Sequence, residues 1–272
     1  MAKGISLHIG LNSVNPNSYA GWDGKLNACE ADANDMQALV NSRGFKSNKL
    51  LTAKATRAAV AAGISDAAKK LVLGDMFLLT YSGHGGQLPD QNGDEIDGKD
   101  ETWVLYDSEM VDDELYAAWS QFKAGVRILV LSDSCHSGTV VRDVMLRAGP
   151  GEFQHSAYRA MPSDIALRTY EANRKFYDPI LQNRDLIKAA EAVKASVLLI
   201  SGCTDNQLSS DGTFNGLFTG TLKSVWNGGT FKGSYRQFHK AILQKMPSDQ
   251  SPELLIIGAA NKVFLGSEPF KI

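Results

Sequence analysis

Two side chains that could do chemistry follow apolar stretches of this sequence. Cys135 comes directly after "LVLSDS", and His84 stands between glycines in "YSGHGG". A thiol becomes a nucleophile when a neighbouring base lowers its pKa, although most free cysteines are small buried hydrophobic residues. His84 precedes Cys135 by 51 residues, and two consecutive parallel strands would bring both to one edge of a sheet. The pattern therefore predicts a Cys-His pair for nucleophilic catalysis.

A second histidine, His136, directly follows Cys135 and is the competing base. Sequence neighbours at a tight turn generally point apart, and a general base must lie within hydrogen-bond reach of the proton that it takes. His84 is therefore the preferred partner. Cys29 begins a predicted helix and Cys203 ends a predicted strand, and we interpret both as structural thiols.

The elements that must position these residues are short apolar runs separated by helical patterns. The runs predict strands at 5–12, 45–52, 76–82, 126–133, 196–202 and 253–258. Apolar residues at helical spacing predict helices at 28–42, 54–72, 113–123, 214–227 and 233–246. Strands that are apolar on both faces and alternate with helices are typical of a parallel sheet covered on both sides. We therefore predict a doubly wound α/β architecture.

Ligand sites in such sheets lie at the carboxyl ends of the strands. Three predicted strands end in polar turns that contain glycine, namely "YSGHGG", "SDSCHSG" and "SGCTDNQ". The segment 139–195 is different, because it is rich in Arg, Lys and Ala. We interpret it as a helical insertion between the fourth and fifth strands, within a single domain that spans residues 1–272.

The composition excludes several classes of protein. Hydrophobic residues make up 43% of the chain and charged residues 21%, as in ordinary soluble globular proteins. A net charge of −2 gives no reason to expect nucleic-acid or membrane-surface binding. No stretch approaches the ~20 apolar residues of a membrane span, and no signal peptide is evident, so we expect a cytoplasmic protein. The three cysteines form no disulfide framework, and the glycine-rich turns match no nucleotide-binding motif.

The segment 90–113 holds ten carboxylates and one lysine. It is not an EF-hand, because the glycine and the terminal glutamate of that loop are not at the required spacing. Clustered aspartates and backbone carbonyls are nevertheless the ligands that calcium prefers. A calcium site and a solvated acidic loop both fit the pattern, and the sequence leaves this choice open.

The His84 and Cys135 motifs resemble those of the metacaspases, which are caspase-like cysteine peptidases. A histidine about 50 residues before the cysteine is also a caspase signature. The similarity extends over roughly residues 3–260 through "LNACEADANDM", "DGKDETWVLYD" and "SGCTDNQLSSDGTFNGLFTGTL", with 139–195 poorly matched. The resemblance implies a caspase-like three-layer sandwich with a mostly parallel sheet of about six strands. It also implies a monomer that acts on protein or peptide substrates.

The resemblance implies that a dyad of Cys135 and His84 cleaves peptide bonds. Cys135 would attack the carbonyl carbon, and His84 would protonate the leaving amine. Backbone N–H groups near Gly85 and Cys135 would hold the developing oxyanion, which requires no special side chain. No third residue that orients His84 is evident from the sequence.

Asp133 stands two residues before the nucleophile. A carboxylate that lines the pocket for the residue before the scissile bond would select Arg or Lys and repel Asp. The resemblance adds Asp32 and Ser82 to this pocket. Asp32 fits an exposed carboxylate in the first turn of a helix equally well.

Many metacaspases are activated by calcium, and their calcium-binding aspartates resemble Asp100, Asp112 and Asp113. A further aspartate that the family places shortly after the nucleophile falls near Arg142, with Asp143 beside it. The reaction itself requires no cofactor, so calcium enters only as a candidate activator.

Two other functions fit the sequence. The chain could be a catalytically silent caspase-fold scaffold or sensor, or an unrelated cysteine hydrolase on a doubly wound sheet. If it does cut after basic residues, the insertion supplies candidate self-cleavage points at Arg142, Arg147, Arg159, Arg168 and Arg174.

Overall fold

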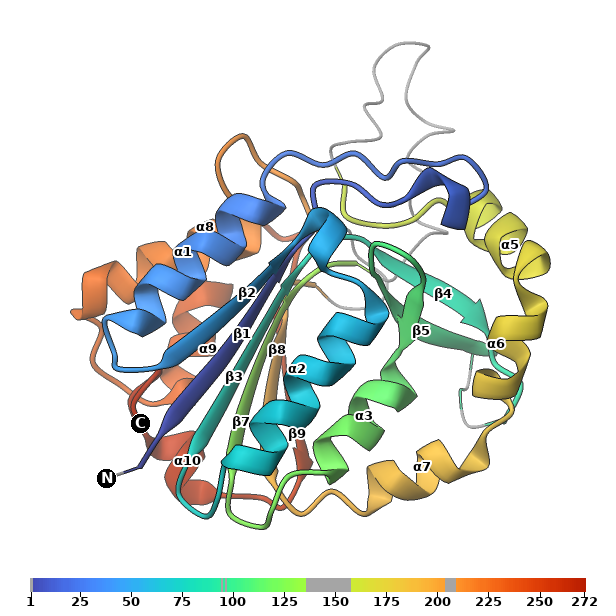
Figure 1. Ribbon diagram of the computed structural model, residues 1–272. Coiled ribbons are helices and arrows are strands. Elements are labelled where there is room, and N and C mark those ends of the chain that lie inside the picture. The colour runs from blue at the N-terminus through green and yellow to red at the C-terminus, as the bar shows by residue number, and fades with distance from the viewer. Residues whose placement is uncertain (1, 94, 96, 136–157, 204–208) are drawn as a thin grey trace.

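The computed structural model describes residues 2–93, 95, 97–135, 158–203 and 209–272. They form three layers, with a six-stranded sheet between two layers of helices (Figure 1). The strand order is β2-β1-β3-β7-β8-β9, and only β9 runs antiparallel to its neighbour. The predicted α/β class with a mostly parallel sheet is therefore confirmed.

The strands of this sheet match the six predicted runs to within a few residues. They are β1 (Gly4–Gly10), β2 (Lys46–Leu51), β3 (Met76–Ser82), β7 (Arg127–Asp133), β8 (Ser196–Ser201) and β9 (Glu253–Gly258). Every residue of β3 is buried, because neighbours pair with it on both edges and helices cover both faces. Its near-continuous apolar sequence follows from that position.

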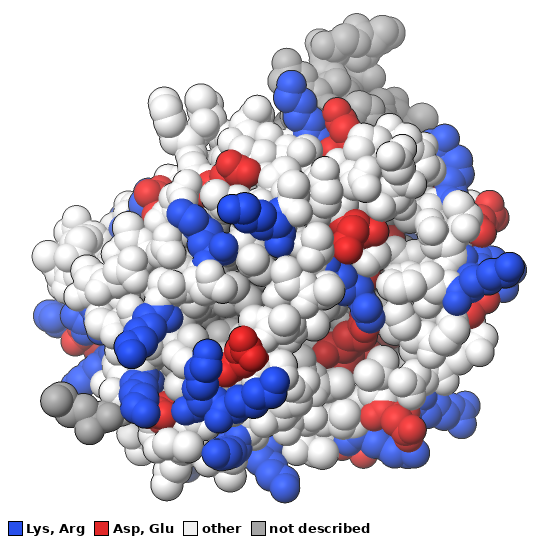
Figure 2. Space-filling model, viewed as in Figure 1, with Lys and Arg blue, Asp and Glu red and all other residues white. Residues whose placement is uncertain are grey.

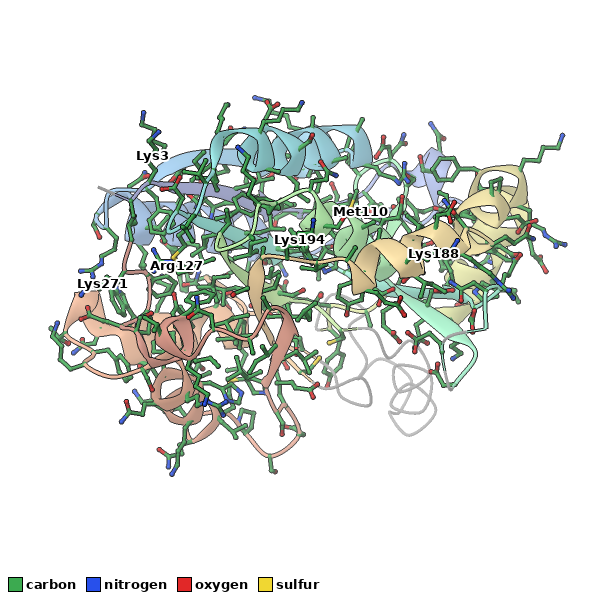
Figure 3. All side chains as sticks on the ribbon, turned by 90° about the horizontal axis from the view of Figure 1, so that it is seen from below. Lys3, Met110, Arg127, Lys188, Lys194 and Lys271 are labelled. Atoms are coloured by element: carbon green, nitrogen blue, oxygen red, sulfur yellow. The ribbon has the colours of Figure 1, made fainter. Side chains whose placement is uncertain are left out.

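Helices cover the two faces of the sheet in separate groups. On one face, Ile64 of α2 and Trp119 of α3 share a core cluster with Phe77 of the sheet. On the other, Met36 of α1 and Phe218 of α8 pack in a second cluster. Viewed from below, α2 lies on one side of the sheet and the C-terminal helices on the other (Figure 3). The helices are α1 (Cys29–Asn41), α2 (Arg57–Lys70), α3 (Asp112–Ser120), α8 (Leu217–Trp226), α9 (Tyr235–Leu243) and α10 (Lys262–Gly266), with short 3-10 turns at Pro16–Ser18, Thr52–Lys54 and Asn227–Gly229.

A second, antiparallel sheet was not predicted from the sequence. It consists of β4 (Gly85–Pro89), β5 (Lys99–Val104) and β6 (Glu109–Val111). In β5 the buried positions include Asp100 and Thr102, so the strand lacks the apolar alternation that would have revealed it. Residues 99–104 and 109–113 of the segment 90–113 therefore lie in strands and a helix rather than in a solvated loop.

In the described part of the predicted insertion, three helices lie between β7 and β8. They are α5 (Ser163–Ala172), α6 (Arg174–Leu181) and α7 (Arg184–Glu191), and the part of the insertion at 139–157 lies outside the described residues. Tyr170 and Tyr177 pack against Leu88 and Val111 of the second sheet. These contacts attach the insertion to the second sheet, whose first strand, β4, directly follows His84.

The strand register aligns the ends of β3 and β7. Ser82 pairs with Asp133, and both are the last residues of their strands. The loops that carry His84 and Cys135 therefore leave the sheet side by side, two residues beyond this pair.

The described helices include none with the length and apolar character that a bilayer crossing requires. On the face shown in Figure 2, basic and acidic side chains are interspersed. Charge is thus mixed over this part of the surface.

Glu109 of β6 is a fully buried carboxyl group in the second sheet. Its Oε2 accepts the Thr102 hydroxyl at 2.6 Å, and burial raises the pKa of Glu109 to about 8. The folded protein therefore holds this proton over a range of pH in which an unfolded chain, with the ordinary pKa of 4.5, releases it.

We predict that this proton makes stability fall as the pH rises through the window from about 5 to 8. Glu109→Gln keeps the neutral shape and should remove that part of the decline. The measurement is the free energy of unfolding in urea across this window. Glu171→Gln, at an exposed position on α5, is the control that should track the wild type. A Glu109→Gln protein with the wild-type pH dependence would contradict the assignment.

Candidate active site

Cys135 and His84 lie on adjacent loops at the carboxyl ends of β7 and β3. Their exposed fractions are 0% and 3%. The thiol is buried because Arg159 and Ser209 lie directly against Cys135. The competing base, His136, lies outside the described residues.

The His84 ring is held in one orientation by a backbone carbonyl. Its Nε2 lies 3.0 Å from the carbonyl oxygen of Gly24. Since a carbonyl only accepts hydrogen bonds, Nε2 carries the proton and the neutral ring keeps its lone pair on Nδ1. That Nδ1 is buried without a hydrogen-bond partner among the described residues. Trp22 packs against the ring with centroids 4.7 Å apart, so the free nitrogen is fixed in place.

Burial sets the protonation of both candidate catalytic groups. It lowers the pKa of His84 to about 3, against the opposing effect of backbone groups of Gly24 and Ala160. It raises the pKa of the Cys135 thiol well above its usual range, and the neighbouring Cys203 adds to this shift. A hydrogen bond from the Ser209 N–H to the sulfur acts in the opposite direction. In the closed site the thiol and the imidazole are therefore both neutral.

Two backbone N–H groups converge on one carbonyl oxygen, that of Arg159. Gly85 donates to it at 2.9 Å and Cys135 at 3.1 Å. On one side of this carbonyl the Arg159 N–H donates to Ser209 at 3.0 Å, and on the other the Met161 N–H donates to Gly85 at 2.7 Å. The backbone on both sides of Arg159 thus crosses the carboxyl ends of the strands, and the Arg159 carbonyl oxygen points at the N–H of Cys135.

The Arg159 side chain fills a pocket lined by aspartates. Its guanidinium donates to Asp32 at 2.7 Å, to Asp133 at 2.9 Å and to Asp211 at 2.9 Å. It also donates to the Ser82 hydroxyl at 2.8 Å. The side chains of Arg159, Asp32, Asp133 and Asp211 are each no more than 2% exposed.

Neighbouring segments hold the carboxylates in place. Asp133 accepts the hydroxyl of Thr219 at 2.7 Å, its backbone N–H at 3.1 Å, and the Ser209 hydroxyl at 2.7 Å. Thr219 lies in the first turn of α8, where the helix dipole favours negative charge. Asp32 accepts the backbone N–H of Gly216 at 3.0 Å. The aspartates are therefore positioned by the fold and not by Arg159 alone.

Gly216 leaves the space in which the guanidinium lies. A Cβ at this position would be 2.5 Å from Cζ of Arg159, far inside contact distance. Its backbone has φ −59° and ψ 153°, which any residue can adopt, so the requirement for glycine is one of space.

Comparisons with known proteins show the family to which this chain belongs. A family model of the caspase domain matches residues 13–262. Metacaspase-1 of Schizosaccharomyces pombe is 30% identical over 93% of this chain and 67% of its own, and Metacaspase-1 of Mycosarcoma maydis is 28% identical over 93% and 70%. The crystal structure of protein GSU0716 from Geobacter sulfurreducens is 55% identical, with a TM-score of 0.87, over 99% of this chain and 98% of its own. The chain belongs to the metacaspase/caspase-like family.

In this member of the family, the structure gathers most of the site residues that the sequence suggested. The N–H groups of Gly85 and Cys135 lie on the Arg159 carbonyl, and His84 directly precedes Gly85 in the chain. Asp32, Ser82 and Asp133 lie together around its guanidinium. The alternative prediction for Asp32 was an exposed carboxylate in the first turn of a helix. The predicted exposure is wrong, because Asp32 is 1% exposed.

Sequence reasoning missed three contributors to this site. Asp211 adds a third carboxylate, Gly24 supplies the carbonyl that orients His84, and Ser209 supplies backbone groups beside Cys135. Asp211 follows the fifth predicted strand, so the rule that sites lie at strand ends could have indicated it. Gly24 acts through its backbone, which leaves no signal in residue type, and Ser209 acts through its backbone beside Cys135 and through its hydroxyl on Asp133.

The aspartates proposed as calcium ligands lie at a separate place. Asp112 forms a group with Glu95 and Glu101, in which one oxygen from each lies within 4.8 Å of the others. Asp100 and Asp113 are buried and are not part of this group. Arg142 and Asp143 lie outside the described residues.

We predict that Gly216→Ala destabilises the protein, because the new methyl group overlaps the guanidinium of Arg159. Overpacking of this kind costs about 1–3 kcal/mol. The matched control is Gly220→Ala on α8, where the nearest atom would be 3.6 Å away and alanine is a better helix former. Thermal unfolding of both variants is the measurement. Equal stability of the two variants would show that the pocket is looser than described.

Proposed function

We propose that this protein is a cysteine endopeptidase that cleaves peptide bonds after Arg or Lys, with Cys135 as nucleophile and His84 as general base and acid. The observation that supports it best is the position of Arg159. Its side chain lies on the aspartates while its carbonyl oxygen lies on the N–H groups of Gly85 and Cys135. A substrate residue before the scissile bond would need the same two sets of contacts. Membership in a family of cysteine peptidases supports the same activity.

The proposed reaction uses these groups in turn. Nδ1 of His84 takes the thiol proton, and the sulfur of Cys135 attacks the carbonyl carbon while the two N–H groups stabilise the oxyanion. His84 then gives the proton to the leaving amine, and the C–N bond breaks to leave a thioester on Cys135. Water hydrolyses the thioester, releases the carboxylate product and restores the thiol.

The pocket contacts favour Arg over Lys. In the docked Arg159, Nε and Nη2 face Asp211, Nη2 also faces Asp32, and Nη1 faces Asp133. A guanidinium presents these donors in a fixed planar fork, whereas an ammonium is a single compact charge. An acidic substrate side chain would be repelled by three carboxylates.

We predict that the wild type, assayed with calcium, hydrolyses an Arg-terminated fluorogenic peptide and leaves the Asp-terminated analogue intact. Cys135→Ala should abolish this activity. His84→Ala should lower kcat/KM by about 10²- to 10⁴-fold, the usual contribution of a general base.

Asp133→Asn should lower kcat/KM for the Arg peptide roughly 30-fold or more, since loss of one partner of a buried charge pair costs about 2–5 kcal/mol. Asp164→Asn, at an exposed site on α5, is the matched control and should retain wild-type turnover. Equal hydrolysis by the wild type and Cys135→Ala would refute the proposal. A stable but inactive wild type would instead support the scaffold or sensor function.

We further propose calcium as the activating ion, held by the group of Glu95, Glu101 and Asp112. Burial and the neighbouring carboxylates, Glu101 first among them, raise the pKa of Asp112 well above its usual range. Such crowding of like charges is relieved by a hard cation, and oxygen donors are its preferred ligands. The donor set therefore fits calcium, as the resemblance to metacaspases implied for Asp112.

Calorimetric titration with calcium chloride tests this site. We expect Asp112→Asn to weaken binding at least about tenfold, because it removes a charged ligand. Asp66→Asn on α2, where the side chain is 64% exposed, should leave the affinity unchanged. No heat of binding to the wild type, or the same affinity for Asp112→Asn, would exclude the site.

A further inference from the structure

A second cysteine lies next to the candidate nucleophile. Cys135 follows the end of β7, and Cys203 follows the end of β8. These two strands pair in parallel, with Ser132 opposite Ser201. The thiol of Cys203 donates a hydrogen bond to the carbonyl oxygen of Ser134 at 3.4 Å, one residue before Cys135. The two cysteines therefore meet at the carboxyl ends of adjacent strands.

The side chains of the two cysteines are in contact. Burial raises the pKa of the Cys135 thiol, and a hydrogen bond with the Cys203 side chain is the next largest cause. A disulfide joins residues whose Cα atoms are about 4.4–6.8 Å apart, and neighbouring strands of a sheet lie about 4.7–4.9 Å apart. Loops that leave two such strands side by side therefore begin at a separation that suits a disulfide.

Cys203 also lines an open cavity of about 270 Å³. Apolar residues of α3, β7, β8 and β9 form its wall, and Glu95, another residue that lines it, is exposed to solvent. Among the residues that the structure describes, neither Cys135 nor Arg159 lines this cavity. A small solute can therefore reach Cys203 without passing Arg159.

The thiols of the chain differ in their access to a small oxidant. Cys135 is 0% exposed, and its raised pKa keeps the sulfur neutral and unreactive in the closed site. Cys203 requires no opening of that site, because it borders the cavity. Cys29 is fully buried on α1, where burial raises its pKa to about 12. We therefore expect oxidation to begin at Cys203.

We propose that Cys203 is a site of oxidation by hydrogen peroxide and that it then forms a reversible disulfide with Cys135. In the first step the Cys203 sulfur attacks one peroxide oxygen, the O–O bond breaks, and the thiol becomes a sulfenic acid with release of water. In the second step the Cys135 sulfur attacks the sulfenic sulfur, the S–O bond breaks, and the oxygen leaves as water with the Cys135 proton. The peroxide is thus reduced to two water molecules while the two thiols are oxidised.

The disulfide would occupy the sulfur that the proposed peptidase reaction uses. Its effect on activity rests on the proposed function, whereas its formation does not. A thiol reductant restores both thiols by exchange. A sulfur held in a disulfide is also kept from the irreversible sulfinic state, so Cys203 would protect the nucleophile during oxidation.

Peptide mapping of the oxidised chain tests the bond itself. The reduced wild type is treated with hydrogen peroxide, denatured, alkylated with iodoacetamide and analysed by mass spectrometry. Of the three cysteines, we expect only Cys29 to be alkylated, and we expect a linked pair of peptides that contain Cys135 and Cys203. Dithiothreitol should return all three to the alkylated form. Cys29→Ala, the matched control, should form the same link.

Two variants test the order of the steps. Cys203→Ala should form no disulfide. Cys135→Ala should keep a sulfenic acid on Cys203, because the thiol that would react with it is absent. Dimedone added after peroxide should therefore label Cys203 in this variant at least about tenfold more than in the wild type. This label depends neither on peptidase activity nor on the folding of Cys203→Ala.

Hydrolysis of the Arg peptide measures the consequence for activity. Peroxide should inactivate the wild type at least about tenfold faster than Cys203→Ala, because the Cys135 thiol alone is buried and neutral. Dithiothreitol should restore the wild type. Equal rates of inactivation for the two proteins would contradict the role of Cys203.

The outcomes separate this inference from the proposed function. Three alkylated cysteines in the peroxide-treated wild type, a link that includes Cys29, or no dimedone label on Cys203 of Cys135→Ala would overturn the inference and leave the peptidase function standing. A disulfide in a protein that fails to hydrolyse the Arg peptide even when reduced would overturn the peptidase function and leave the inference standing. Full hydrolysis by a protein that carries the disulfide would show that Cys135 is not the nucleophile.

Discussion

A buried network of ion pairs, in which the guanidinium of Arg159 contacts three carboxylates, determines how this candidate active site is built. Asp32 comes from α1, Asp133 from the end of β7, and Asp211 from the segment after β8. Buried carboxylates are unfavourable without a positive partner. Hydrogen bonds from α8 and from Gly216 hold them in place but supply no full positive charge. The pocket therefore requires a cation, which Arg159 provides in this structure.

The parallel sheet explains why chemistry and recognition meet at this point. Ser82 and Asp133 are register partners at the ends of β3 and β7, so their side chains line the pocket while the next two residues of each chain lead to His84 and Cys135. The same two loops supply the N–H groups that hold the Arg159 carbonyl. The side-chain contacts and the carbonyl contacts of Arg159 thus depend on one alignment, and a shift of either strand would disturb both.

The amino-acid sequence was sufficient to predict the main sheet and to identify the candidate functional side chains at the ends of its strands. Apolar periodicity located β3 and β7, and the polar residues after them pointed to His84, Asp133 and Cys135. The sequence was not sufficient where the site is built from backbone groups or from segments that are distant in the chain, as with the carbonyl of Gly24. The second sheet was hidden because β5 buries Asp100 and Thr102 instead of apolar side chains. The burial of Cys135 depends on residues 158–161, and residue type alone does not show where they dock.

The central claim is that this site binds arginine with its carbonyl carbon beside the sulfur of Cys135. The most direct measurement is intact-mass analysis and peptide mapping after treatment with a peptidyl-arginine chloromethyl ketone and with its aspartyl analogue. The account predicts that the arginyl reagent adds one equivalent, on Cys135, and that the aspartyl reagent adds none. Labelling of Cys29 or Cys203 instead, or equal labelling by both reagents, would contradict it.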